Sequence, residues 1–227
     1  MQSKNSTENL NSSSFNKAKP SIWVIIIYGL LVVALVIVGI GIARKVIDRN
    51  KVVKDPFFYL NGEPITKLEY NFYYNSVYRK YISSYSMLFD YMEVDSEKPL
   101  EEQPYDDERT FKQFFEDSTI EAIKKMHALW DEGHSVGFEA DIESDYNSYL
   151  NEVVSSCNAA GISTDDYFSK FYGQYAKEKN IKPFLLMQFY ADKYSEFLAN
   201  KLNKTETDTA AYEYIEELKK GYEVIYP

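Results

Sequence analysis

Between residues 57 and 66 the chain reads Phe57-Phe58-Tyr59-Leu60-Asn61-Gly62-Glu63-Pro64-Ile65-Thr66. An aromatic, β-prone run is followed by Asn-Gly, the dipeptide that favours the tight turn of a hairpin, and then by a short second arm. Thr66 and Glu69 have the spacing of a capping box, in which each side chain accepts a hydrogen bond from the backbone N–H of the other residue. We therefore expect a small β-hairpin that leads directly into a helix ending near Phe89.

That helix carries an apolar stripe rich in tyrosine, which consists of Tyr70, Tyr74, Val77, Tyr81, Tyr85 and Leu88. With its apolar flanks the stripe covers about half of the helix, more than the ~100° that one-sided packing requires. Tyrosine combines a large apolar face with a polar tip, which suits surfaces that hold varied peptides. The stripe is our candidate peptide-binding surface, and the alternative is that these tyrosines fill a helical core.

Apolar residues at steps of three and four predict further helices downstream. They cover residues 111 to about 133, 142 to 160, 163 to 172, 181 to 202, and 210 to 220. Ser163 and Asp166 repeat the capping-box spacing, Pro183 falls in the first turn of its helix, and Cys157 falls on an apolar face. Residues 93–107 are acidic and interrupted by proline, as in a loop, and Asn203 to Thr209 form a polar linker.

The closing residues, Tyr222 to Tyr226, are β-prone. An isolated two-stranded hairpin is marginal in water, so we expect this tail to pair with the Phe57 to Leu60 strand. The predicted fold is mainly α, with a small β-hairpin completed by a terminal strand.

The N-terminal quarter of the chain has a different character. Residues 22–43 contain no charge and would form a helix ~33 Å long, enough to cross a hydrocarbon core of ~30 Å. No cleavage site follows them, so we predict an uncleaved transmembrane helix. Residues 1–21 are polar and are predicted to be a disordered tail. Residues 44–55 form a basic juxtamembrane linker, and residues 56–227 form one folded domain.

Charge narrows the choice of partners. Residues 1–55 hold eight basic and three acidic side chains, a charge of +5, so the total of −10 leaves −15 for residues 56–227. An acidic domain repels phosphate backbones, which argues against nucleic acid as a partner. Five basic residues follow the apolar segment and three precede it, and this small excess mildly favours a cytoplasmic domain without fixing the orientation.

Signatures of enzymes are missing from the sequence. It contains no Gly-rich phosphate loop, serine elbow, CxxC or HExxH pattern. The separation of His127 and His134 is not a recognised ligand spacing, so we interpret both as surface or helix-end residues. The acidic loop lacks the rhythm of a calcium site. We therefore predict no catalytic residue, no cofactor and no metal.

Two motifs resemble those of SurA/PrsA-type foldases. Leu60 to Thr66, with Glu69 and Phe72 following, is similar to the "V-N-G-x-x-I-T-x-x-E-F" opening of that family, and Gly161 to Tyr167 is similar to the "G-x-S-x-D-x-Y" helix start of its chaperone domain. Phe171-Tyr172-Gly173 and the helix to Tyr194 resemble the next segment. The resemblance spans residues 56–227.

The resemblance implies a SurA N-terminal-like chaperone outside the cytoplasm, against the weak charge asymmetry around residues 22–43. Many members carry an inserted parvulin prolyl isomerase, but here the insertion point is the seven-residue linker from Asn203 to Thr209. We therefore expect a membrane-anchored holdase without isomerase activity, which grips exported, unfolded clients and whose acidic surface favours basic ones. The alternatives are an assembly subunit of a membrane complex and a protein with residual prolyl isomerase activity.

Overall fold

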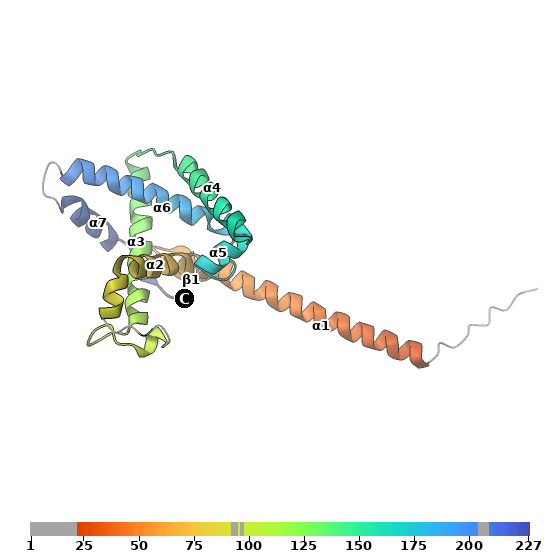
Figure 1. Ribbon diagram of the computed structural model, residues 1–227. Coiled ribbons are helices and arrows are strands. Elements are labelled where there is room, and N and C mark those ends of the chain that lie inside the picture. Colours follow the sequence, from red (N-terminus) through yellow and green to blue (C-terminus); the bar gives the residue numbers. More distant parts are fainter. Residues whose placement is uncertain (1–21, 92–94, 96–97, 204–208) are drawn as a thin grey trace, which may run out of the picture. The chain divides into compact units, whose positions relative to one another are not determined.

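The computed structural model describes the backbone of residues 22–91, 95, 98–203 and 209–227, and the side chains of all of these except 22–34, 39, 84–91 and 203. The chain divides into two units, Met1–Val46 and Ile47–Pro227. The second unit is mainly helical and contains a small antiparallel sheet (Figure 1), which confirms the predicted fold class.

Helix α1 (Ile22–Val53) covers the predicted transmembrane segment and continues through residues 44–53, where we expected a linker. Among the residues that the structure describes, no helix is both long enough and apolar enough to cross a membrane. Most side chains of the segment 22–43 lie outside the described residues, as does the whole of the predicted tail 1–21.

The sheet joins the two ends of the domain. Strands β1 (Pro56–Leu60) and β2 (Glu63–Thr66) form the predicted hairpin, and β3 (Val224–Ile225) pairs with β1 in the order β2-β1-β3. Asn61 and Gly62 both have positive φ, of 49° and 85°, as a type I′ turn requires. The Asn61 side chain also accepts from the Glu223 N–H at 2.8 Å. The predicted pairing of the tail with the first strand is confirmed.

The start of α2 (Lys67–Tyr91) follows the prediction only in part. Thr66 Oγ1 accepts a hydrogen bond from the Glu69 N–H at 3.2 Å, as expected of the cap. The Glu69 carboxylate does not turn back to the cap, because it lies 2.9 Å from His127 Nε2. Both side chains are buried, and a buried carboxylate requires such a partner. The interpretation of His127 as a surface or helix-end residue was wrong.

The remaining helices lie close to their predicted ranges. They are α3 (Phe111–Ser135), α4 (Ile142–Ala160), α5 (Thr164–Tyr172), α6 (Glu178–Leu198) and α7 (Ala210–Lys220). A π turn, Ala199–Asn203, extends α6, and a short 3₁₀ turn, Leu100–Glu102, lies in the acidic segment. Because α6 begins earlier than expected, Pro183 lies in the helix interior and the prediction of a first-turn proline was wrong.

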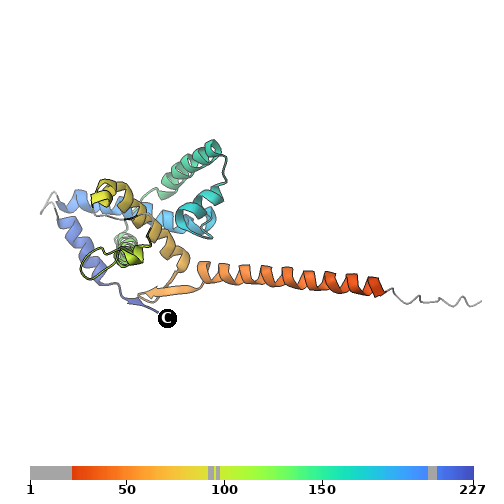
Figure 2. The same ribbon diagram turned by 60° about the horizontal axis from the view of Figure 1, so that its bottom comes forward.

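Helix α3 is the centre of the domain and packs against α2, α6 and α7. Helices α4 and α5 pack on α6 and lie together on one side of the domain (Figure 2). One apolar core joins the sheet to α2 and α6 and includes Cys157, as predicted. A second core joins α3, α6 and α7 around Leu129, Tyr190 and Ile215. Two cores therefore hold α6 along its length, while part of its surface stays uncovered.

Candidate peptide-binding groove

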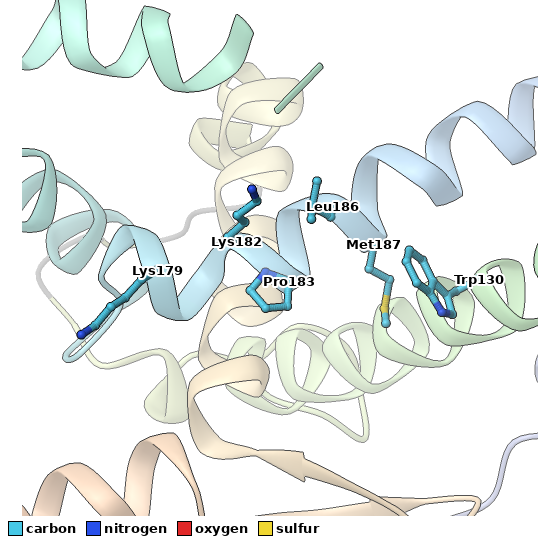
Figure 3. Close-up of a pocket in the computed structure, with 6 residues that line it drawn as sticks. All are labelled: Trp130, Lys179, Lys182, Pro183, Leu186 and Met187. Carbon is cyan, nitrogen blue, oxygen red and sulfur yellow. The ribbon is translucent and has the colours of Figure 1, made fainter. Parts of the chain in front are cut away.

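An open groove runs along the N-terminal half of α6, where Trp130 of α3 lies beside it. It has a volume of about 390 Å³, within the ~300–1,000 Å³ of typical ligand pockets. Figure 3 shows the side chains that line it, which are Trp130, Lys179, Lys182, Pro183, Leu186 and Met187. Four of the six are apolar, and the two lysines lie toward the N-terminal end of α6.

Pro183 gives the groove a backbone acceptor as well as an apolar ring. It is the sixth residue of α6, and its ring is exposed. Proline has no N–H, so the carbonyl of Lys179, four residues earlier, lacks the hydrogen bond that any other residue at 183 would donate. A carbonyl with a missing helical donor therefore lies at the edge of an apolar groove. An extended polypeptide carries N–H groups that fit such an acceptor.

The apolar walls are fixed from behind by the two cores. Tyr73 of α2 is buried, and its hydroxyl donates to Met187 Sδ at 3.6 Å. The Trp130 ring lies 5.0 Å from the Tyr190 ring and 4.4 Å from the His134 ring, measured between centroids. Because buried or packed partners hold both walls, the groove is formed before any ligand arrives.

A polar network closes the end of the groove toward α4. Lys182 Nζ forms an ion pair of 3.0 Å with Glu143 and lies 4.5 Å from the centroid of the Tyr146 ring. The Tyr146 hydroxyl donates to Glu178 at 2.5 Å. Burial, together with this hydrogen bond, raises the pKa of Tyr146, so the hydroxyl keeps its proton and remains a donor. These contacts fix the first turns of α6 against α4.

The structure places the predicted tyrosine stripe against α3. Tyr70 is buried and lies 6.1 Å from the Tyr74 ring, and both Tyr74 and Tyr81 contact the Phe115 ring, with centroids 6.4 Å and 5.3 Å away. Val77 is half-buried. The side chains of Tyr85 and Leu88 lie outside the described residues. The described rings of the stripe thus pack within the domain, as its alternative interpretation expected, and peptide binding by the stripe stays a prediction.

Tyr70 also lines a smaller pocket of about 260 Å³ beside the sheet. Its other lining residues are Phe57, Glu116, Asp117, Ile120 and Tyr226. Lys67 Nζ lies 3.8 Å from the centroid of Phe57 and 4.4 Å from that of Tyr70, so a cation of the chain itself already contacts these rings. This pocket is therefore a weaker candidate for a ligand than the groove on α6.

Residues suited to other chemistry do not gather in the described part of the chain. No group of three or more His, Cys, Asp or Glu residues there is arranged to hold a metal ion. His127 is committed to Glu69, and His134 Nδ1 lies 2.7 Å from the Trp130 carbonyl oxygen. In the acidic loop, the Gln103 amide donates to the carbonyls of Asp95 and Lys98, each at 2.8 Å. What the arrangement on α6 offers is reversible burial of apolar side chains.

The groove itself was not predicted, since its walls come from two helices whose distance no sequence pattern gives. One signal was present: Lys179, Pro183 and Met187 follow one another at steps of four, which places them on one face of a helix. In comparisons with models of protein families, with curated proteins and with solved structures, nothing matched this chain.

Proposed function

We propose that this chain is a membrane-anchored chaperone that holds incompletely folded polypeptides outside the cytoplasm and catalyses no isomerisation. The observation that carries the proposal is the open, preformed apolar groove on α6, with the Lys179 carbonyl at its edge. An unfolded chain offers the two groups that fit it, exposed apolar side chains and unpaired backbone N–H groups. The apolar run 22–43 would serve as the anchor, and the SurA/PrsA-like motifs support the placement outside the cytoplasm.

The size of the groove favours transient holding over permanent assembly. Burial of one large apolar side chain contributes about 1.5–3 kcal/mol, and one hydrogen bond adds about 1 kcal/mol. A total near 4 kcal/mol corresponds to a dissociation constant of about 1 mM for one contact. Such a contact releases its client without a nucleotide cycle. A dedicated subunit interface buries roughly 1,200–2,000 Å², far more than one groove provides.

Suppression of aggregation tests the holding activity. The full-length chain at stoichiometric ratios is expected to slow the aggregation of several unrelated unfolded clients. Leu186→Ser in the groove should weaken this effect, whereas Val154→Ser, at an exposed apolar position of α4, should not. Equal loss in both variants, or no suppression by the unmodified chain, would end the proposal. Thermal unfolding of each variant separates lost binding from lost folding.

Topology is tested by protease shaving of intact cells, or of spheroplasts, that express the protein with a C-terminal tag. The proposal expects loss of the tag while a cytosolic control survives. A tag that becomes cleavable only after lysis would place the domain in the cytoplasm and favour an assembly subunit.

A further inference from the structure

The groove on α6 has a local charge opposite to that of the domain. Residues 56–227 carry a net charge of −15, yet the beginning of α6 carries Lys177 at its N-cap followed by Lys179 and Lys182, with Glu178 as the one acidic residue among them. Because exposed charges separated by more than about 10 Å are largely screened at ~0.1 M salt, a bound segment senses these nearest lysines more strongly than the distant acidic surface.

Three of these four charges already have partners. Lys177 pairs with Asp165 at 2.7 Å, Lys182 pairs with Glu143 at 3.0 Å, and Glu178 accepts the Tyr146 hydroxyl. Lys179 is exposed, and within the described part of the chain it has no ion pair. Lys179 is thus the cation at the groove that remains available for a ligand.

Helix geometry sets the distance between this cation and the apolar wall. Lys179 and Met187 are eight residues apart on one face of α6, which corresponds to about 12 Å at ~1.5 Å per residue. An extended peptide advances ~3.3 Å per residue and covers the same distance in three or four residues. Figure 3 shows Lys179 at the end of α6 away from Met187 and Trp130.

We propose that the groove selects unfolded segments in which an acidic residue lies three or four positions from a bulky apolar one. The apolar side chain contacts Trp130 and Met187, and the carboxylate contacts Lys179. This inference rests on the proposed function. It reverses the expectation that the acidic domain favours basic clients. An exposed ion pair of this kind changes affinity by about two- to fivefold, a selectivity suited to broad recognition.

The chain provides its own reporter for this test. It contains two tryptophans, Trp23 and Trp130, so Trp23→Phe leaves the groove tryptophan as the single one. The full-length Trp23→Phe chain is titrated, and Trp130 emission is followed, with extended peptides that differ at one position, four residues from a leucine pair. That position holds Glu, Gln or Lys, and a fourth peptide carries the Glu eight residues away.

The expected order of affinity is Glu above Gln above Lys, with about two- to fivefold per step, and the distant Glu should match Gln. Lys179→Gln should abolish the preference for Glu, whereas the matched control Lys170→Gln, an exposed lysine of α5, should retain it. The opposite order, or a preference that survives Lys179→Gln, would overturn the inference and leave the groove as a binding site. Absence of any emission change with all four peptides would overturn the proposed function as well.

Discussion

Replacing Pro183 with alanine changes α6 in two opposite ways. Proline in a helix interior costs ~3 kcal/mol relative to alanine, because its N–H is missing and its ring crowds the preceding turn. Part of this cost is offset, since proline also restricts the unfolded chain by about 0.4–1 kcal/mol. The Pro183 ring is exposed and fills little of the core. We expect Pro183→Ala to raise the free energy of unfolding by about 2 kcal/mol, or ~4–8 °C in melting temperature.

The same change should weaken binding. Alanine removes the ring from the groove, and its N–H occupies the Lys179 carbonyl that proline leaves without a donor. Loss of one hydrogen bond of about 1 kcal/mol corresponds to about fivefold lower affinity for an unfolded client. Urea denaturation followed by circular dichroism gives the stability, and Trp130 emission in the Trp23→Phe background gives the affinity.

Glu196→Ala, at an exposed position near the other end of α6, is the matched control and should change stability by no more than about 0.5 kcal/mol. A Pro183→Ala chain that is less stable would show that the ring supports the fold. A chain that is more stable but binds clients with unchanged affinity would show that neither the ring nor the carbonyl serves the groove. Either result would refute the reasoning.

Three further predictions concern the fold that supports the groove. Gly133→Ala should destabilise the domain by about 1–2 kcal/mol in thermal unfolding despite the higher helix propensity of alanine, because the added methyl would lie 2.6 Å from Tyr190 Oη, in a ring that is buried and hydrogen-bonded to the Phe138 carbonyl. Glu69→Leu and His127→Leu should each cost about 3 kcal/mol, and the double variant should cost less than their sum by at least ~1 kcal/mol in a urea-denaturation cycle. Burial raises the pKa of three core-side tyrosines, so the folded state holds their protons more tightly than the unfolded state. Their contribution to stability is complete below the unfolded pKa of ~10 and is lost as pH rises through the folded pKa, which an alkaline urea series with tyrosinate absorbance would record. The three are Tyr70, Tyr73 and Tyr149.

Each of these has a clear failing result. A Gly133→Ala chain as stable as the unmodified one would mean that the Tyr190 ring moves aside at no cost. Strict additivity of the two leucine substitutions would mean that the buried pair contributes no coupling. A urea midpoint that stays constant well above pH 10 would mean that these tyrosines titrate alike in the folded and unfolded states.

The local fold was readable from the sequence because its signals are local. Asn61-Gly62 specifies a turn with two positive φ values, and Thr66 and Ser163 each cap the helix that follows, as their spacing predicts. The pairing of β3 with β1 was also predictable, since a bare hairpin needs a further strand. The error at Glu69 arose because His127, 58 residues later in the chain, competes for its carboxylate.

The candidate site was much less predictable. The tyrosine stripe was chosen for its composition, but which face of a helix a neighbour covers depends on tertiary packing, and α3 covers the described rings. Pro183 looked harmless only because the helix start was placed three residues too late. The groove requires Trp130 to lie beside Met187, a contact between residues 57 positions apart that no periodicity encodes.

Site-specific photo-crosslinking in living cells tests the central claim, that the groove on α6 holds unfolded polypeptides, most directly. A photoreactive amino acid at position 186 of the full-length chain lies in the groove, and the same amino acid at position 154 on α4 is the control. The account predicts many products of different mass from position 186, more of them when newly exported proteins are prevented from folding, and few from position 154. A single product of fixed mass from position 186, or equal labelling from both positions, would contradict it.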